Sequence, residues 1–147
     1  MNTLSTMSEV LASYQINGQP VPAEAFYATA CDPARSIAVE ACAGAGKTWM
    51  LVARIVRALL DGTPAQDILA ITFTKKAAGE MRARLGSELR RCAGLDEAGL
   101  VQTLRSWGCG DAEARRRAPE LKTLHQRVTA SGRQVQLRTF HSWFSAL

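Results

Sequence analysis

A run of small residues that ends in lysine and threonine, at positions 41–48, constrains the fold of this chain more than any other feature. An apolar segment at 37–39 precedes it, and a pattern typical of an amphipathic helix follows through Leu60. A tight loop between a strand and a helix directs backbone N–H groups at phosphates, and the helix start adds partial positive charge. Lys47 can then reach the β- and γ-phosphates of a nucleotide, while the Thr48 hydroxyl can bind Mg²⁺.

The usual form of this loop is Gly-x-x-x-x-Gly-Lys-Ser/Thr, and Ala41 stands where the first glycine would be. A glycine-rich turn with a solvated lysine is the alternative, but the strand before and the helix after favour a nucleotide site. We therefore predict ATP and Mg²⁺ as cofactors, with Lys47 and Thr48 as the groups closest to the chemistry. The predicted nucleotide-binding residues are Ala41, Cys42, Ala43, Gly44, Ala45, Gly46, Lys47 and Thr48.

The bulk composition is that of a globular protein. The 147 residues suffice for one core, and 47% are hydrophobic while 21% are charged. No apolar run approaches the roughly 20 residues of a membrane helix. The N-terminus carries no basic residue before Arg35, so it lacks the charged start of a secretory signal. The four cysteines show no pairing or metal-binding pattern with the two histidines, which favours reduced thiols and a cytoplasmic location.

Charge is unevenly distributed along the chain. Residues 1–70 hold four basic and six acidic side chains, a net charge of −2. Residues 71–147 hold fourteen basic and seven acidic side chains, a net charge of +7, and the two halves give the overall +5. The second half is therefore the part expected to contact a polyanion, although an ordinary solvated surface is the alternative. The same two interpretations apply to the basic run at 115–117.

The remaining pattern predicts an α/β fold with a parallel sheet, in which 37–39 and 68–71 flank a helix as a βαβ unit. Along that helix, Val52, Ile55, Val56 and Leu59 should face the sheet, and Arg54, Arg57 and Asp61 the opposite side. Pro119 should separate two short helices. The other expected elements are an Asn-Gly hairpin at 14–21, a helix at 22–31, a helix after Thr74, helices at 96–107, 111–117 and 120–130, and a strand at 135–139.

A second motif follows the predicted strand 68–71. Thr72 and Thr74 offer hydroxyl groups, Phe73 a stacking face, and the pair at 75–76 positive charge. In an open α/β sheet ligands bind at the carboxyl ends of the strands, and these groups suit a phosphodiester backbone with unstacked bases. The more ordinary interpretation is that Thr74 only caps the next helix.

Residues 41–48 and 72–81 together resemble motifs I and Ia of the UvrD/Rep-type superfamily 1 DNA helicases, and 139–142 resembles their next motif that contacts single-stranded DNA. The resemblance spans roughly residues 22–147, after an N-terminal tail and possible hairpin at 1–21. It is closest to the AddA/RecB-like helicases of double-strand break repair.

The resemblance implies a RecA-like P-loop NTPase domain with a helical insertion near 87–132. It implies a 3′-to-5′ helicase of recombination and repair that acts on single- and double-stranded DNA, and whose possible protein partner is a second helicase–nuclease subunit. No membrane is implied. The residues expected to contact DNA are Thr72, Phe73, Thr74, Lys75, Lys76, Thr139, His141 and Ser142.

Two departures from the family pattern matter. Such helicases usually carry a glutamine that reads the adenine edge, which by spacing would fall near Ala25, where only Glu24 and Ala25 stand. An aromatic residue, Phe26 or Tyr27, could lie against adenine, but these rings are more typical of a core. The 147 residues also lack the family's Asp-Glu pair, its γ-phosphate-sensing arginines and its second motor domain. We therefore expect the N-terminal part of a motor domain that alone neither hydrolyses ATP nor unwinds DNA.

Two other classes of protein remain as alternatives. A stand-alone P-loop kinase or small NTPase would need a catalytic arginine lid and an acceptor pocket, and the motif at 72–76 argues against it. A non-catalytic module that binds single-stranded nucleic acid would show no dependence on ATP. Nucleotide binding and its effect on DNA binding separate these classes.

Overall fold

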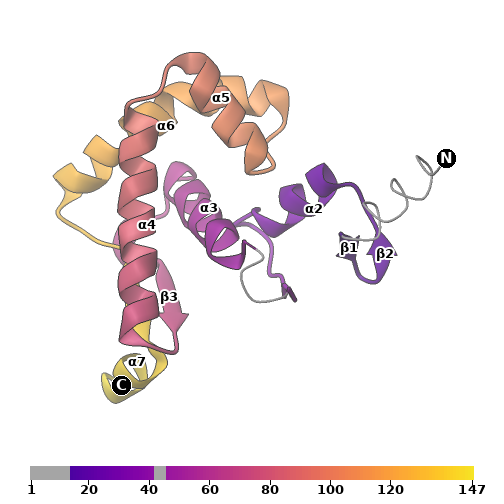
Figure 1. The fold of residues 1–147 in the computed structure, drawn as a ribbon. Helices are drawn as coiled ribbons and strands as arrows, with labels where there is room; N and C mark the ends of the chain where they lie inside the picture. Colours follow the sequence, from indigo (N-terminus) through magenta and orange to yellow (C-terminus); the bar gives the residue numbers. More distant parts are fainter. Residues whose placement is uncertain (1–13, 42–45) are drawn as a thin grey trace.

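Two short parallel strands lie beside one long helix, and most of the other helices pack against one another (Figure 1). The structure, a computed structural model, describes residues 14–41 and 46–147. In chain order the elements are β1 (Gln15–Ile16), β2 (Gln19–Pro20), α2 (Ala23–Ala30), α3 (Lys47–Leu60), the 3₁₀ turn η1 (Ala65–Asp67), β3 (Leu69–Thr72), α4 (Lys75–Ala93), α5 (Glu97–Ser106), α6 (Asp111–Ser131), β4 (Gln136–Thr139) and α7 (Phe140–Ser145).

The parallel pair joins segments that are far apart in sequence. β3 and β4 run in register from Leu69 opposite Gln136 to Thr72 opposite Thr139, and α4, α5 and α6 form the connection between them. Side chains alternate along both strands, so Leu137 and Thr139 are buried on the face where α4 packs. On the other face Leu69 and Ile71 are 40% and 43% exposed. The unbroken apolar run 68–71 predicts a strand covered on both faces, and this prediction is wrong for the part of the chain that the structure describes.

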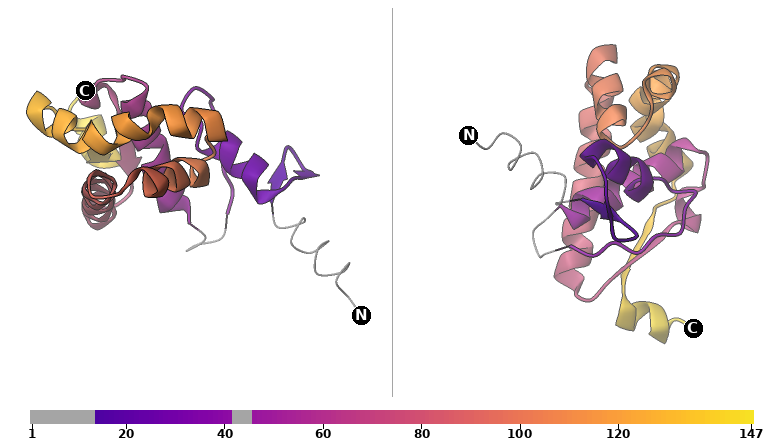
Figure 2. Two further views of the ribbon diagram at one scale, coloured as in Figure 1. Left: turned by 90° about the horizontal axis from the view of Figure 1, so that it is seen from above. Right: turned by 90° about the vertical axis from the view of Figure 1, so that its right-hand side faces the viewer.

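Helix α3 lies between α4 and α2, and Figure 2 shows the hairpin and α2 projecting from the side away from α4. The apolar stripe predicted on α3 is buried as expected, with Val56 fully inaccessible. Its main packing partners are α4 and α6, however, and not the sheet. The core is thus largely helical, and its largest fully buried side chains are Trp107, Leu100, Leu104, Leu121 and Leu124.

Several predicted elements are confirmed. The Asn-Gly hairpin forms with Asn17 and Gly18 at φ of 51° and 78°, as a type I′ turn requires. The helix predicted at 22–31 is α2, and the helix after Thr74 is α4. The strand predicted at 68–71 is β3, shifted by one residue at both ends, and the strand predicted at 135–139 is β4, which begins one residue later.

One predicted strand and one predicted helix break are wrong. Without the strand at 37–39, the predicted βαβ unit does not form among the described residues. Residues 36–41 form no strand, because a strand requires a hydrogen-bonded neighbour and the described ladders join only β1 to β2 and β3 to β4. Pro119 does not divide the helix, since α6 continues through it. The proline removes one backbone hydrogen bond, but Ala118 and Leu121 on either side of it are fully buried in one core, and this packing holds the helix together.

Candidate nucleotide and nucleic-acid site

The candidate nucleotide site lies at the N-terminus of α3. Gly46 precedes the helix at φ 83°, a left-handed conformation that glycine adopts without strain, and Lys47 is the first helical residue. The Lys47 Nζ donates a hydrogen bond to the Ala41 carbonyl oxygen at 2.9 Å, and Thr48 follows in the first turn. Four of the eight predicted nucleotide-binding residues are therefore placed at one helix start. Cys42, Ala43, Gly44 and Ala45 lie outside the described residues.

Electrostatics at this helix start favour an anion. The first turn of α3 contains no acidic residue, and among the described residues no side chain caps it. The first N–H groups of a helix lack intrahelical partners and carry the positive end of the helix dipole. A phosphate group would satisfy these donors and gain the lysine charge as well.

The second group of predicted residues meets at the carboxyl ends of β3 and β4. Thr72 and Thr139 lie opposite each other in the ladder, and the helices that follow, α4 and α7, begin side by side (Figure 1). This neighbourhood is the edge at which an open parallel sheet binds ligands. Residues from the two separate motifs are thus brought together by one pair of strands.

The hydroxyl groups at this edge are already used by the fold. Thr74 Oγ1 accepts from the Ala77 N–H at 3.0 Å as the N-cap of α4. Thr139 and Ser142 form a reciprocal capping box at the start of α7, and Thr139 is only 8% exposed. Thr72 Oγ1 donates to the Thr74 carbonyl oxygen at 3.0 Å. These four hydroxyls therefore have structural partners.

The other predicted residues at the edge present their side chains to solvent. Lys75, Lys76 and His141 are exposed, and Phe73 is 96% exposed. Phe140 and Phe144 on α7 are 55% and 64% exposed and stack with ring centroids 6.2 Å apart. Aromatic rings and ammonium groups without a burial partner in the described fold are the groups available to stack on bases and pair with phosphates. The α7 rings were not predicted, although their spacing of four in the sequence was visible.

An aromatic cluster joins α2 to α3. The ring of Tyr27 meets Trp49 edge-on with centroids 5.3 Å apart, and Tyr14 lies 5.2 Å from Phe26. A hydrogen bond between the Tyr27 and Tyr14 hydroxyl groups, together with burial, raises the pKa of Tyr27 to about 12. The cluster agrees with a packing role for Tyr27. Phe26 is half-buried and also lines a cavity.

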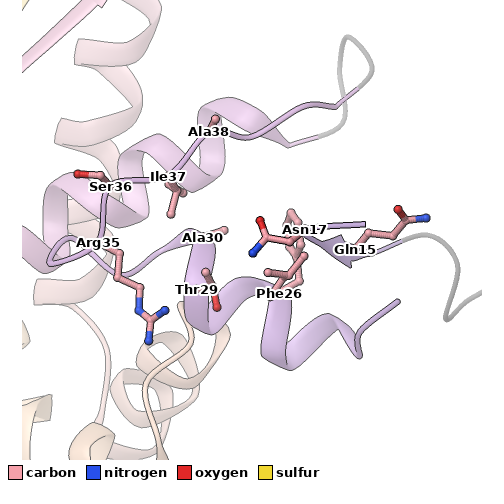
Figure 3. A pocket seen from close by; sticks show the side chains of 10 residues that line it. Gln15, Asn17, Phe26, Thr29, Ala30, Arg35, Ser36, Ile37 and Ala38 are labelled. Atoms are coloured by element: carbon pink, nitrogen blue, oxygen red, sulfur yellow. The ribbon is translucent and has the colours of Figure 1, made fainter. Parts of the chain in front are cut away.

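That cavity has a volume of about 480 Å³ and lies between the hairpin, α2 and residues 35–38 (Figure 3). Asn17 and Thr29 bring polar groups to it, and Phe26 brings an aromatic wall. Glu24 and Ala25, where the family's glutamine was expected, line a different cavity that α2 shares with the turn between α5 and α6.

Three arginines have roles that the sequence did not reveal. Arg57 was expected on the exposed side of α3, but it is 8% exposed, and its Nη1 donates to the Trp107 carbonyl oxygen at 3.0 Å. Arg54 bonds to the turn before the nucleotide loop. Within the basic run, Arg117 pairs with Asp61 and so ties α6 to the end of α3. Neither a solvated face nor a polyanion contact describes Arg117.

The buried thiols are neutral. Cys31 and Cys92 are fully inaccessible, and burial raises the pKa of each to about 11. Burial also raises the pKa of Cys109. Cys42 lies outside the described residues.

The fold thus combines an uncapped helix start, a structure suited to phosphate, with two parallel strands whose carboxyl ends form one edge. This is the arrangement of the nucleotide-dependent class of α/β proteins. The family model for the UvrD/REP helicase N-terminal domain matches residues 23–146, and the chain belongs to this family. The resemblance noted in the sequence is therefore confirmed. No solved structure matches the chain.

Curated relatives are named as one subunit of an ATP-dependent helicase/nuclease. The protein of Lactobacillus gasseri is 47% identical over 58 residues, which cover 40% of this chain and 5% of that protein. The protein of Carboxydothermus hydrogenoformans is 53% identical over 57 residues, covering 37% of this chain and 5% of that protein. The chain thus matches about one-twentieth of the length of these relatives. Within the described residues, no helix combines the length and apolar character needed to cross a membrane.

Proposed function

We propose that the chain binds Mg–ATP at the start of α3 and single-stranded DNA at the carboxyl ends of β3 and β4. The placement of Lys47 at an uncapped helix start, against the Ala41 carbonyl, carries the nucleotide part. Lys47 would bind the β- and γ-phosphates and Thr48 would bind Mg²⁺. The exposed ring of Phe73 beside Lys75 and Lys76 supports the DNA part.

In the whole protein we propose that 22–147 is the N-terminal part of a RecA-like motor domain, with a helical insertion near 87–132, in a superfamily 1 helicase of recombination and repair. Translocation would run 3′ to 5′ in the cytoplasm, on single-stranded DNA drawn from a duplex. Because the relatives are named as one subunit of a helicase/nuclease, we propose a second helicase–nuclease subunit for the partner. Residues 1–147 alone would neither hydrolyse ATP at a useful rate nor unwind DNA, because no group in them is assigned to orient water or stabilise the developing charge.

Two reciprocal variants test both sites. Lys47→Ala should abolish Mg–ATP binding in isothermal titration calorimetry and leave DNA affinity unchanged. Lys75→Ala with Lys76→Ala should do the reverse. Equal nucleotide affinity of the wild type and Lys47→Ala would refute the nucleotide site.

DNA binding has its own signature. Each lost phosphate contact lowers the slope of log affinity against log salt by about 0.7 on single strands, so the double lysine variant should lose about 1.4. Phe73→Ala should weaken binding by about 1–3 kcal/mol, whereas Phe73→Trp should retain it. If DNA affinity depends neither on salt nor on Lys75, Lys76 and Phe73, as judged by their alanine variants, the proposed DNA edge is refuted.

Catalysis is tested on the same preparations. We expect no ATP turnover by residues 1–147, with or without single-stranded DNA. DNA-stimulated turnover that Lys47→Ala abolishes would contradict this expectation. Nucleotide binding that alters DNA affinity would exclude a passive DNA-binding module, while phosphoryl transfer to a small acceptor would favour a kinase.

A further inference from the structure

Arg54 donates hydrogen bonds to three backbone carbonyl groups, at the end of α2 and in the turn that follows it. Its Nη1 donates to the carbonyl oxygens of Ala30 and Asp32 at 3.0 and 2.7 Å, and its Nη2 donates to that of Arg35 at 2.8 Å. Arg54 lies on α3, about two helical turns after Lys47. One guanidinium therefore fastens the end of α2 and the following turn to the helix that presents the lysine.

The turn that Arg54 holds is also stabilised by contacts of its own. Asp32 accepts from the Ala34 N–H at 2.9 Å and pairs with the Arg35 Nε at 3.3 Å. Cys31, at the end of α2, is fully buried. These contacts hold the backbone of the turn in one conformation. Its carbonyl groups therefore already point toward Arg54, and the turn can attach to α3 in only one position.

The segment 36–41, which enters the nucleotide loop, is consequently held by α3 at both ends. Arg54 holds the chain at Arg35, and Lys47 holds it at Ala41 through the 2.9 Å hydrogen bond. When the Lys47 ammonium turns to the phosphates of a nucleotide, it gives up the Ala41 carbonyl. Arg54 is then the anchor that remains.

Given the nucleotide site proposed above, on which this role rests, we propose that Arg54 is a positioning residue for nucleotide binding. It fixes where residues 36–41 lie relative to Lys47 and Thr48, without touching the nucleotide. A displacement of about 1 Å costs a reaction about 100-fold in rate, and the same loosening should lower nucleotide affinity by a smaller but measurable factor.

A lysine cannot replace this arginine. The planar guanidinium presents donors on two edges and so spans three carbonyl groups, whereas an ammonium is a single point of charge. Arg54→Lys keeps the charge but leaves carbonyl groups of the turn without partners. Arg54→Ala removes the charge and the hydrogen-bond donors, and it leaves a space that a free guanidinium ion can enter.

The test measures Mg–ATP affinity by calorimetry for Arg54→Lys and Arg54→Ala. We expect the dissociation constant to rise about 10-fold or more in each. Single-stranded DNA affinity should stay at the wild-type value. Millimolar guanidinium should restore nucleotide affinity to Arg54→Ala but not to Lys47→Ala, a result that general destabilisation cannot produce.

Arg117→Ala serves as the matched control, because it removes an arginine that ties α6 to the far end of α3. It should destabilise the fold and leave nucleotide affinity unchanged. Wild-type affinity in folded Arg54→Ala or Arg54→Lys would overturn the role of Arg54, as would a loss that Arg117→Ala shares. If Arg54→Ala does not fold, Arg54→Lys decides between these outcomes. Absence of Lys47-dependent binding in the wild type would instead overturn the nucleotide site, and the role of Arg54 with it.

Discussion

Gly108, in the turn between α5 and α6, provides the sharpest test of how the helices pack on α2. Its φ of +87° lies in the left-handed region. A Cβ atom at this position would overlap the Ala28 Cα and would lie 2.7 Å from both the Ala28 nitrogen and the Tyr27 carbonyl oxygen. These are backbone atoms of α2 and cannot rotate away. Gly108→Ala must therefore either separate the turn from α2 or distort one of them.

The expected loss has two parts. A left-handed alanine costs about 1–2 kcal/mol. Overpacking against a fixed neighbour costs about 1–3 kcal/mol more. The sum of about 2–5 kcal/mol is a large part of the stability of a domain of this size, which is typically about 5–15 kcal/mol. At about 2–4 °C per kcal/mol, the melting temperature should fall by about 4–20 °C.

Two other glycines separate these contributions. Gly132 has a φ of +65° with open space around it, so Gly132→Ala measures the backbone term alone. Gly79 lies in α4 with nothing close to it, so Gly79→Ala should stabilise by about 0.5–1 kcal/mol through helix propensity. Urea unfolding followed by circular dichroism gives the three free energies. If Gly108→Ala loses no more than Gly132→Ala, the close approach of the α5–α6 turn to α2 is refuted.

Two further predictions concern the buried thiols and the N-cap of α4. The pKa of Cys31 and of Cys92 is raised from 9.0 to about 11 in the folded chain. Above pH 9 the unfolded chain therefore loses thiol protons that the folded chain keeps until about pH 11. The free energy of unfolding should fall across this range. The double Cys31→Ala/Cys92→Ala variant should show a shallower fall, and an unchanged slope would contradict the assignment. Thr74→Ala should lower the free energy of unfolding by about 1 kcal/mol through loss of the α4 cap, whereas Thr74→Ser should not; equal stability of the alanine and serine variants would argue against capping.

Local signals predicted most of the elements because each signal is satisfied within a few residues. The Asn17-Gly18 turn sets its own hairpin, and Thr74 caps the helix that it precedes. The helical apolar stripe on α3 is buried because any core would bury it. These features depend little on what the rest of the chain does.

The failures are features that distant parts of the chain decide. Residues 37–39 are apolar enough for a strand, but a strand forms only where a neighbour offers its backbone groups, and no sequence window reports that neighbour. Arg57 fits the polar side of the α3 pattern, yet the Trp107 carbonyl, fifty residues away, gives it a buried partner. Pro119 is tolerated because of packing on both sides of it. The sequence shows these residues but not their tertiary partners.

The candidate DNA edge shows why the sequence could place a site without assigning roles within it. The carboxyl end of a parallel strand is both the ligand edge of the sheet and the start of the next helix, so capping hydroxyls and ligand-binding groups occupy the same few positions. The hydroxyl groups of Thr74 and Thr139 cap α4 and α7, so the fold already accounts for them. Phe73 differs, because burying a phenylalanine side chain stabilises a protein by about 1.5–3 kcal/mol, and here that gain is forgone at 96% exposure. An apolar ring left in water contributes little to the fold described, and we propose a stacked base as its partner.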